Sequence, residues 1–150
     1  MLQKLKYLKY FIGLLCNNWK QSKDSYSQHG EDKLIENLLP KRVSSFLDIG
    51  ANDGTLLDGV SRYRIRIGCE PAPNLWDKLK DNCDIMIPEM WDHKYLDQYI
   101  CTHPSTEYIN NKAKAITAIG MFYDMDNPND FISSVKEALT DDGIFIAQLM

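Results

Sequence analysis

Short apolar runs alternate with longer amphipathic stretches between residues 26 and 150. The apolar runs are rich in β-branched residues, are typical of buried strands, and occupy residues 43–49, 64–70, 83–88, 114–122 and 143–150. The stretches with helical signals lie at residues 31–39, 55–63, 73–81, 92–101 and 128–139. Because strands that alternate with helices form βαβ units, the pattern predicts an α/β fold, a Rossmann-like, doubly wound, mostly parallel sheet of about five strands.

Polar residues mark both ends of the last predicted helix. Asn127 can cap its N-terminus, with Pro128 at the first helical position. We expect Asp141, Asp142 and Gly143 to end the helix before the last strand.

The first 25 residues have a different pattern. Apolar residues at steps of three and four form one stripe, and residues 1–23 contain five lysines and no acidic residue. This predicts a basic amphipathic helix over residues 1–25, ahead of a domain at 26–150. Its longest apolar run, from Tyr10 to Cys16, is far shorter than the ~20 residues that a membrane-spanning helix needs. Docking on its own domain or a partner is the favoured interpretation, and contact with an anionic membrane surface stays open.

Composition and charge narrow the class of protein. The chain has 150 residues, 44% of them hydrophobic, and a formal net charge of −4, which suits one soluble domain. An acidic balance argues against a dedicated nucleic-acid binder. The four cysteines form no C-x-x-C pair and have no histidine nearby at the spacing of a metal site, so we expect no metal site. Thiols scattered in this way favour a protein of the reducing cytoplasm. The cysteines are Cys16, Cys69, Cys83 and Cys101.

The stretch FLDIGANDG ends the first predicted strand and opens the turn after it. Gly50 and Gly54 would let a ligand approach the backbone at this turn. The dinucleotide fingerprint G-x-G-x-x-G fails, because Asn52 and Thr55 stand where it requires glycine. Asp53 would also repel a diphosphate. The turn therefore favours a phosphate-free, positively charged cofactor such as S-adenosylmethionine over NAD.

Glu70 ends the second predicted strand, 22 residues after Asp48. A carboxylate at this place can accept both hydroxyls of a ribose. This geometry serves any adenosine-bearing cofactor and does not by itself separate NAD from S-adenosylmethionine. The alternative interpretation of Glu70 is a solvated side chain at the end of the strand.

Five segments in order resemble the successive motifs of class I S-adenosylmethionine-dependent methyltransferases: FLDIGANDGTLL, IGCEPAPNL, IPEMW, ITAIGMFYDMDNPNDFISSVKEAL and DDGIFIAQLM. Over residues 43–150 the chain most closely resembles the methyltransferase domain of the sugar C-methyltransferase family. YSQHGED at residues 26–32 instead resembles the motif that opens FkbM-type methyltransferases, which act on small-molecule hydroxyls. The resemblance implies methyl transfer from S-adenosylmethionine to a small-molecule acceptor, such as a sugar nucleotide or a related carbohydrate.

The resemblance also implies site residues. The implied cofactor contacts are Asp48, Gly50, Asn52, Asp53, Gly54, Glu70, Pro71, Glu89, Met90, Gly120 and Met121. Glu89 would bind the adenine amino group, while Met90 can equally be a core residue. Tyr123 and Asp124 would face the transferred methyl as acid, base or positioning groups, or would serve only as a wall and a helix-entry acid. His29 would approach from the lid side or be merely solvated, and His93 and His103 show no partner pattern.

The chain also departs from the sugar C-methyltransferase pattern. That family has an N-terminal cysteine-rich zinc segment and continues past the fifth strand through a histidine-bearing catalytic segment and two further strands. We therefore expect a truncated chain whose sheet lacks the usual last two strands and whose general base is absent. Three hypotheses follow. The first is a methyltransferase of which this chain is the cofactor-binding half. The second is a non-catalytic cofactor-binding or assembly module that another chain or oligomerisation completes, and the third, which is disfavoured, is an NAD-dependent oxidoreductase.

Overall fold

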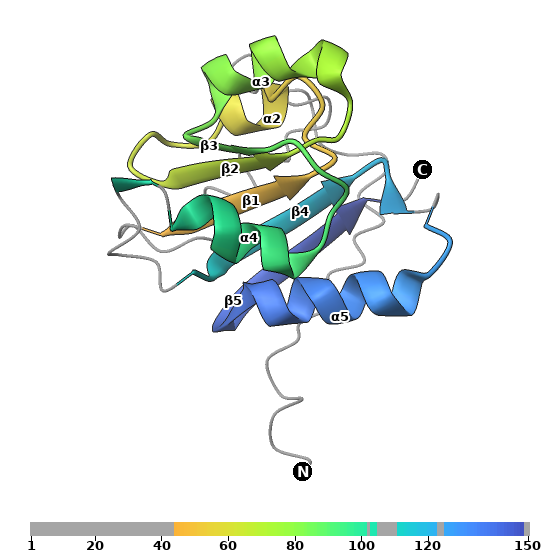
Figure 1. Ribbon diagram of the computed structural model, residues 1–150. Helices are drawn as coiled ribbons and strands as arrows, with labels where there is room; N and C mark the ends of the chain where they lie inside the picture. Colours follow the sequence, from red (N-terminus) through yellow and green to blue (C-terminus); the bar gives the residue numbers. More distant parts are fainter. Residues whose placement is uncertain (1–43, 102, 105–110, 123–124, 149–150) are drawn as a thin grey trace, which may run out of the picture.

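The protein folds around one five-stranded sheet in a computed structural model that describes residues 44–101, 103–104, 111–122 and 125–148 (Figure 1). All paired strands are parallel, and their order across the sheet is β3-β2-β1-β4-β5. The strands are β1 (Ser45–Ile49), β2 (Ile65–Cys69), β3 (Ile85–Ile87), β4 (Ala113–Ile119) and β5 (Leu139–Gln148). The predicted α/β, Rossmann-like fold is confirmed.

Helices cover both faces of the sheet. One face carries α2 (Thr55–Asp58), the short 3-10 helix η2 (Pro73–Leu75) and α3 (Trp76–Asn82), and the other carries α4 (His93–Ile100) and α5 (Pro128–Ala138) (Figure 1). The chain runs outward from β1 to β3 and then returns to β4 on the other side of β1. The strand order therefore reverses between β1 and β4, which is where ligands bind in open α/β sheets.

The central strand β1 is buried on both faces. Phe46 belongs to the apolar cluster that includes Leu57 of α2 and Leu79 of α3. Leu47 and Ile49 belong to the cluster on the side of α4 and α5. Helices on both faces explain why the strands appear in the sequence as continuous apolar runs.

Two predicted boundaries are wrong. The helix predicted at 55–63 ends after four residues, where Gly59 is the C-cap and the chain turns back toward β2. The last strand begins at Leu139 rather than 143, directly after α5. Asp141 and Asp142 lie in an irregular part of its pairing with β4, so they bulge the strand instead of separating it from the helix.

The predicted start of α5 is confirmed, because Asn127 is its N-cap, with Pro128 in the first turn, and the Asn127 side chain accepts a hydrogen bond from the Asp130 N–H. Several other predictions fall outside the described residues: the helices at 1–25 and 31–39, the YSQHGED segment with His29, and Tyr123 and Asp124. In the part of the chain that the structure describes, no helix has the length and apolar character needed to cross a bilayer.

Candidate functional site

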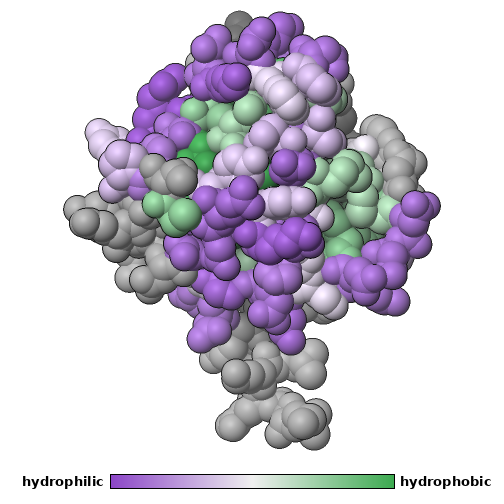
Figure 2. Space-filling model, in the orientation of Figure 1, coloured by the Kyte–Doolittle hydropathy of each residue, from purple (hydrophilic) through white to green (hydrophobic). Residues whose placement is uncertain are grey.

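A cavity of about 620 Å³ opens at the carboxyl edge of the sheet, on the side of α4 and α5. Its volume is in the range of small-molecule sites, ~300–1,000 Å³. Figure 2 shows hydrophobic side chains at the surface on the right of the view, the side toward which the strand arrows of Figure 1 point. The apolar part of the wall includes Ile49, Cys69, Met90, Trp91, Met121 and Phe131, and the polar part includes Glu70, Asp92, His93, Asp130, Ser134 and Glu137.

The glycine turn after β1 forms one wall of this cavity. Gly50 has a φ of +73°, and its N–H donates to the carbonyl of Cys69 over 2.9 Å, which fixes the turn against the end of β2. A Cβ at Gly50 would lie 3.0 Å from Cγ of Met121. Asn52 has a φ of +53°, a conformation that Asn tolerates better than most residues, so the turn forms without a second glycine there.

Glu70 holds the turn from the end of β2. Its side chain is 8% exposed, and its two carboxylate oxygens accept the N–H of Asn52 (3.0 Å) and the N–H of Ala72 (2.9 Å). Each oxygen retains a further lone pair, and Glu70 lines the cavity. The interpretation of Glu70 as a solvated strand end is therefore wrong.

Asp48 lies beneath the turn instead of in the cavity wall. Asp48 is 3% exposed as a residue, and the hydroxyl of Thr117 on β4 donates to its carboxyl group over 2.6 Å. Burial raises the pKa of Asp48 to about 7, Thr117 opposes this shift, and the nearby charge of Glu70 adds to it. Its expected contact with the cofactor stays a prediction.

Two predicted residues of the turn face away from the cavity. A Cβ at Gly54 would lie 2.7 Å from Cβ of Asn82 on α3, so this glycine permits helix packing. The carboxylate of Asp53 accepts hydrogen bonds from the N–H and hydroxyl of Thr55, and the pKa of Asp53 is lowered mainly by this hydroxyl.

The remaining predicted residues divide into two groups. Pro71, Met90 and Met121 lie in the cavity wall. Gly120 and Glu89 lie outside the wall, and the backbone carbonyl of Glu89 accepts a hydrogen bond from the Cys69 thiol over 3.3 Å.

The sequence interpretation missed the wall formed by α5. Asp130, Ser134 and Glu137 recur at helical spacing and line the cavity, while Phe131 and Val135 on the same helix belong to the buried core. This polar stripe was visible in the predicted helix at 128–139, but only the sheet topology shows that it faces a cavity.

The interpretation also missed His93. Asp92 is the N-cap of α4, and its carboxylate accepts the N–H of Lys94 over 3.0 Å, which places His93 at the first helical position. The N–H of His93 donates to the hydroxyl oxygen of Ser134 over 2.8 Å. His93 thereby links the start of α4 to α5 at the cavity wall.

The ionisable groups of the wall are mainly acidic. Its charged side chains include four carboxylates and neither Lys nor Arg, and the carboxylates are Glu70, Asp92, Asp130 and Glu137. Lys94 pairs with Asp92 over 2.9 Å and holds the pKa of that carboxyl below its usual range. The wall therefore gives a phosphate group no cationic partner among the described residues.

Cys69 does not supply a nucleophile. Burial, with added effects from nearby carboxylates, raises the pKa of its thiol to about 12, so the thiol is protonated at neutral pH. Among the described residues, no group of three or more His, Cys, Asp or Glu side chains could hold a metal ion.

Comparison with known proteins gives matches at the level of structure. Neither a protein-family model nor a curated protein sequence matches this chain. A TehB-like S-adenosylmethionine-dependent methyltransferase from Corynebacterium glutamicum matches with a TM-score of 0.56 and 21% identity, over 80% of this chain and 62% of that one. The plantazolicin methyltransferase BpumL, in complex with a pentazolic desmethylPZN analog and S-adenosylhomocysteine (SAH), matches with a TM-score of 0.52 and 17% identity, over 79% of this chain and 43% of that one.

A third match has a different activity. The precorrin-8w decarboxylase of Methanobacterium thermoautotrophicum has a TM-score of 0.53 and 14% identity, over 80% of this chain and 62% of that one. Identities this low establish the fold alone. The chain has the Rossmann-like fold of class I S-adenosylmethionine-dependent methyltransferases, and it spans less than two thirds of the length of these three structures.

Proposed function

We propose that this protein binds S-adenosylmethionine and transfers its methyl group to a small-molecule acceptor. The observation that carries the proposal is one cavity that joins the bare backbone of Gly50 to the carboxylate of Glu70 and whose wall, among the described residues, has neither Lys nor Arg. A cofactor with a sulfonium, an ammonium and no phosphate matches this wall, whereas the diphosphate of NAD would face uncompensated carboxylates.

The residues around Glu70 fit an adenosyl group. The remaining lone pairs of Glu70 can accept the two ribose hydroxyls, because its present partners are two backbone N–H groups. Pro71 and Met90 offer apolar surface to the adenine ring. The methionyl part would lie over Gly50, where Cγ of Met121, a flexible side chain, lies 3.0 Å from the position that a Cβ on Gly50 would take.

The charge of the wall also bears on the acceptor. A sugar nucleotide would bring its own diphosphate, and the described wall has no cation to pair with it. We therefore propose a phosphate-free small molecule, with a sugar nucleotide as the competing acceptor. Methyl transfer to a panel that holds an amine, a phenol, a free sugar and a sugar nucleotide distinguishes them.

Calorimetric titration with S-adenosylhomocysteine and with NAD tests the cofactor. We expect S-adenosylhomocysteine to bind and NAD to bind far more weakly or not at all. Glu70→Ala should weaken S-adenosylhomocysteine about 100-fold, because two hydrogen bonds to a charged acceptor are lost. The matched control is Asp77→Ala, which removes an exposed carboxylate of α3 outside the cavity and should leave the affinity unchanged.

Two results would overturn this assignment. Tighter binding of NAD than of S-adenosylhomocysteine would favour the oxidoreductase. Binding of S-adenosylhomocysteine without methyl transfer to any member of the panel would favour the non-catalytic module.

A further inference from the structure

The wall that α4 and α5 share contains a histidine whose surroundings match those of a general base. The Nδ1 atom of His93 lies 3.4 Å from Oγ of Ser134 and 3.5 Å from Oδ1 of Asp92. Both contacts involve the same ring nitrogen. Among the described residues, the Nε2 atom makes no hydrogen bond, and the side chain is 47% exposed at the cavity.

The neighbours of His93 select one tautomer. The Asp92 carboxylate accepts hydrogen bonds only, so it favours the ring form with hydrogen on Nδ1 and a lone pair on Nε2. Ser134 receives the backbone N–H of His93, which fixes the start of α4 against α5. Contacts of this kind are often long before substrate binds and shorten in the reacting complex.

We propose that His93 is the general base for the acceptor, taking its proton at Nε2 during methyl transfer, an inference that rests on the proposed function. The lone pair of an acceptor oxygen or nitrogen forms the new bond to the methyl carbon. The bond from that carbon to sulfur breaks, and sulfur keeps the electron pair as a neutral thioether. The acceptor proton moves to Nε2, and the imidazolium then releases it to water.

This assignment defines the class of acceptor. A base of this kind can take the proton of an O–H or N–H group, so the acceptors that fit the assignment are an alcohol, a phenol or an amine. Asp92 and Ser134 are positioning residues, because they act through the ring of His93. The charged groups that line the same cavity as His93 are Glu70 after β2, Asp92 at the start of α4, and Asp130 and Glu137 on α5, and Lys94 pairs with Asp92.

Nitrogen-15 NMR of the histidine rings tests the inference without an acceptor, on the full chain with S-adenosylmethionine or S-adenosylhomocysteine bound. We expect His93 to hold its hydrogen on Nδ1 in both complexes. We also expect the Nε2 resonance of His93 to differ between the two complexes, because only S-adenosylmethionine places a positive sulfonium in the same cavity. The variant His93→Gln identifies the signal.

Two variants separate a base from a bystander. His103→Gln removes a histidine outside the cavity wall, so the tautomer and the ligand-dependent shift of His93 should persist. Asp92→Asn retains a residue that can cap α4 but removes the carboxylate, so the preference of His93 for hydrogen on Nδ1 should weaken in both complexes.

Different results would overturn the proposed function and the assignment of His93. If S-adenosylhomocysteine does not bind, the proposed function is overturned. If it binds but His93 carries its hydrogen on Nε2, or gives the same Nε2 resonance with the two ligands, the assignment of His93 is overturned and the cofactor assignment stands.

Discussion

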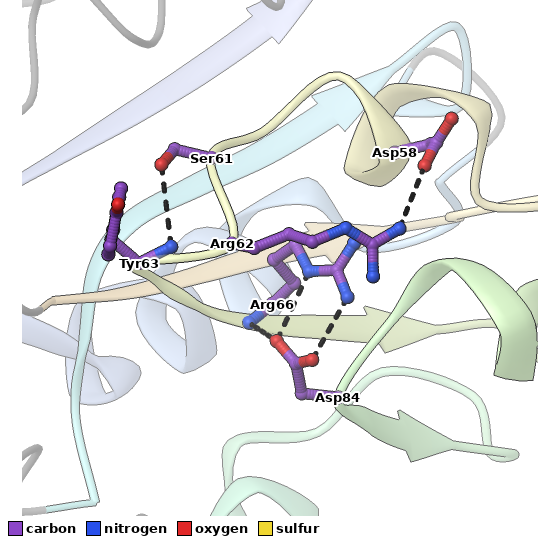
Figure 3. A network of polar contacts seen from close by, with 6 residues as sticks. All are labelled: Asp58, Ser61, Arg62, Tyr63, Arg66 and Asp84. Carbon is purple, nitrogen blue, oxygen red and sulfur yellow. Dashed lines mark hydrogen bonds and ion pairs between the residues drawn. The ribbon is translucent and has the colours of Figure 1, made fainter.

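At the amino end of β2, the carboxylate of Asp84 accepts hydrogen bonds from Nε (3.2 Å) and Nη2 (2.9 Å) of Arg66 (Figure 3). At the carboxyl end of the same strand, the donors to the carboxylate of Glu70 among the described residues are backbone N–H groups. Both acids join β2 to a neighbouring segment. They differ in that Asp84 has a cationic partner and Glu70 has none among the contacts of its carboxylate.

This difference separates a structural acid from one that can serve a ligand. The Arg66 side chain is 3% exposed, so its charge is stabilised chiefly by Asp84. Glu70 instead leaves negative charge at the cavity, and this charge adds to the burial that raises the pKa of Asp48. A positively charged ligand could supply the compensation that the protein omits.

The largest expected effect on stability comes from removing the carboxylate that pairs with Arg66 at the amino end of β2. Asp84→Ala should lower the free energy of unfolding by about 3 kcal/mol, because it leaves the buried guanidinium of Arg66 without its counter-charge. Urea unfolding measures the change. The matched control is Asp58→Ala, which breaks the exposed pair with Arg62 (3.6 Å) in the same view and should cost less than about 0.5 kcal/mol (Figure 3). Equal losses in the two variants would contradict the contrast.

The next effect concerns the pH dependence of stability. The folded pKa of Asp48, about 7, lies above its unfolded value of ~3.9, so the folded state binds the extra proton and its stability falls as pH rises between these values. Asp84 acts in the opposite direction. Partial burial opposes the shift, but hydrogen bonds from Arg66 hold its pKa below the usual value, so its contribution is lost as pH falls through the folded pKa.

Asp48→Asn removes the titration of the buried carboxyl group of Asp48. Relative to the unaltered protein without ligand, this variant should gain about 2 kcal/mol of unfolding free energy between pH 5 and pH 8. Urea unfolding at the two pH values measures the difference, with the exposed Asp81→Asn as control. Parallel pH profiles for Asp48→Asn and the unaltered protein would show that Asp48 does not titrate in this range.

The smallest expected effect on stability concerns the glycine turn after β1. Gly50→Ala should lower the free energy of unfolding by about 1–2 kcal/mol, because alanine is strained at a positive φ and its Cβ would press on Met121. Gly59→Ala is the control, since Gly59 has an ordinary helical φ of −73° and the change should be nearly neutral. Thermal unfolding distinguishes them, and an equal shift in both would argue against strain at Gly50.

Local signals predicted most of the fold and the part of the cavity wall around Gly50 and Glu70. Asn127 before Pro128 defined the start of α5, and a Gly-rich turn between two apolar runs defined the crossover at Gly50. The wall of α4 and α5 could not be read in the same way. His93 and Ser134 are 41 residues apart, and no local pattern joins them.

The sequence by itself determined the parallel sheet, the glycine turn and the acid that ends β2, because apolar periodicity, backbone freedom and strand ends are properties of neighbouring residues. Only the tertiary structure decided which side chains share the cavity and which carboxylates have a cationic partner. Those relations depend on how β3 leads back to β4 and brings α4 against α5, and long-range packing of that kind leaves no fixed spacing in the chain.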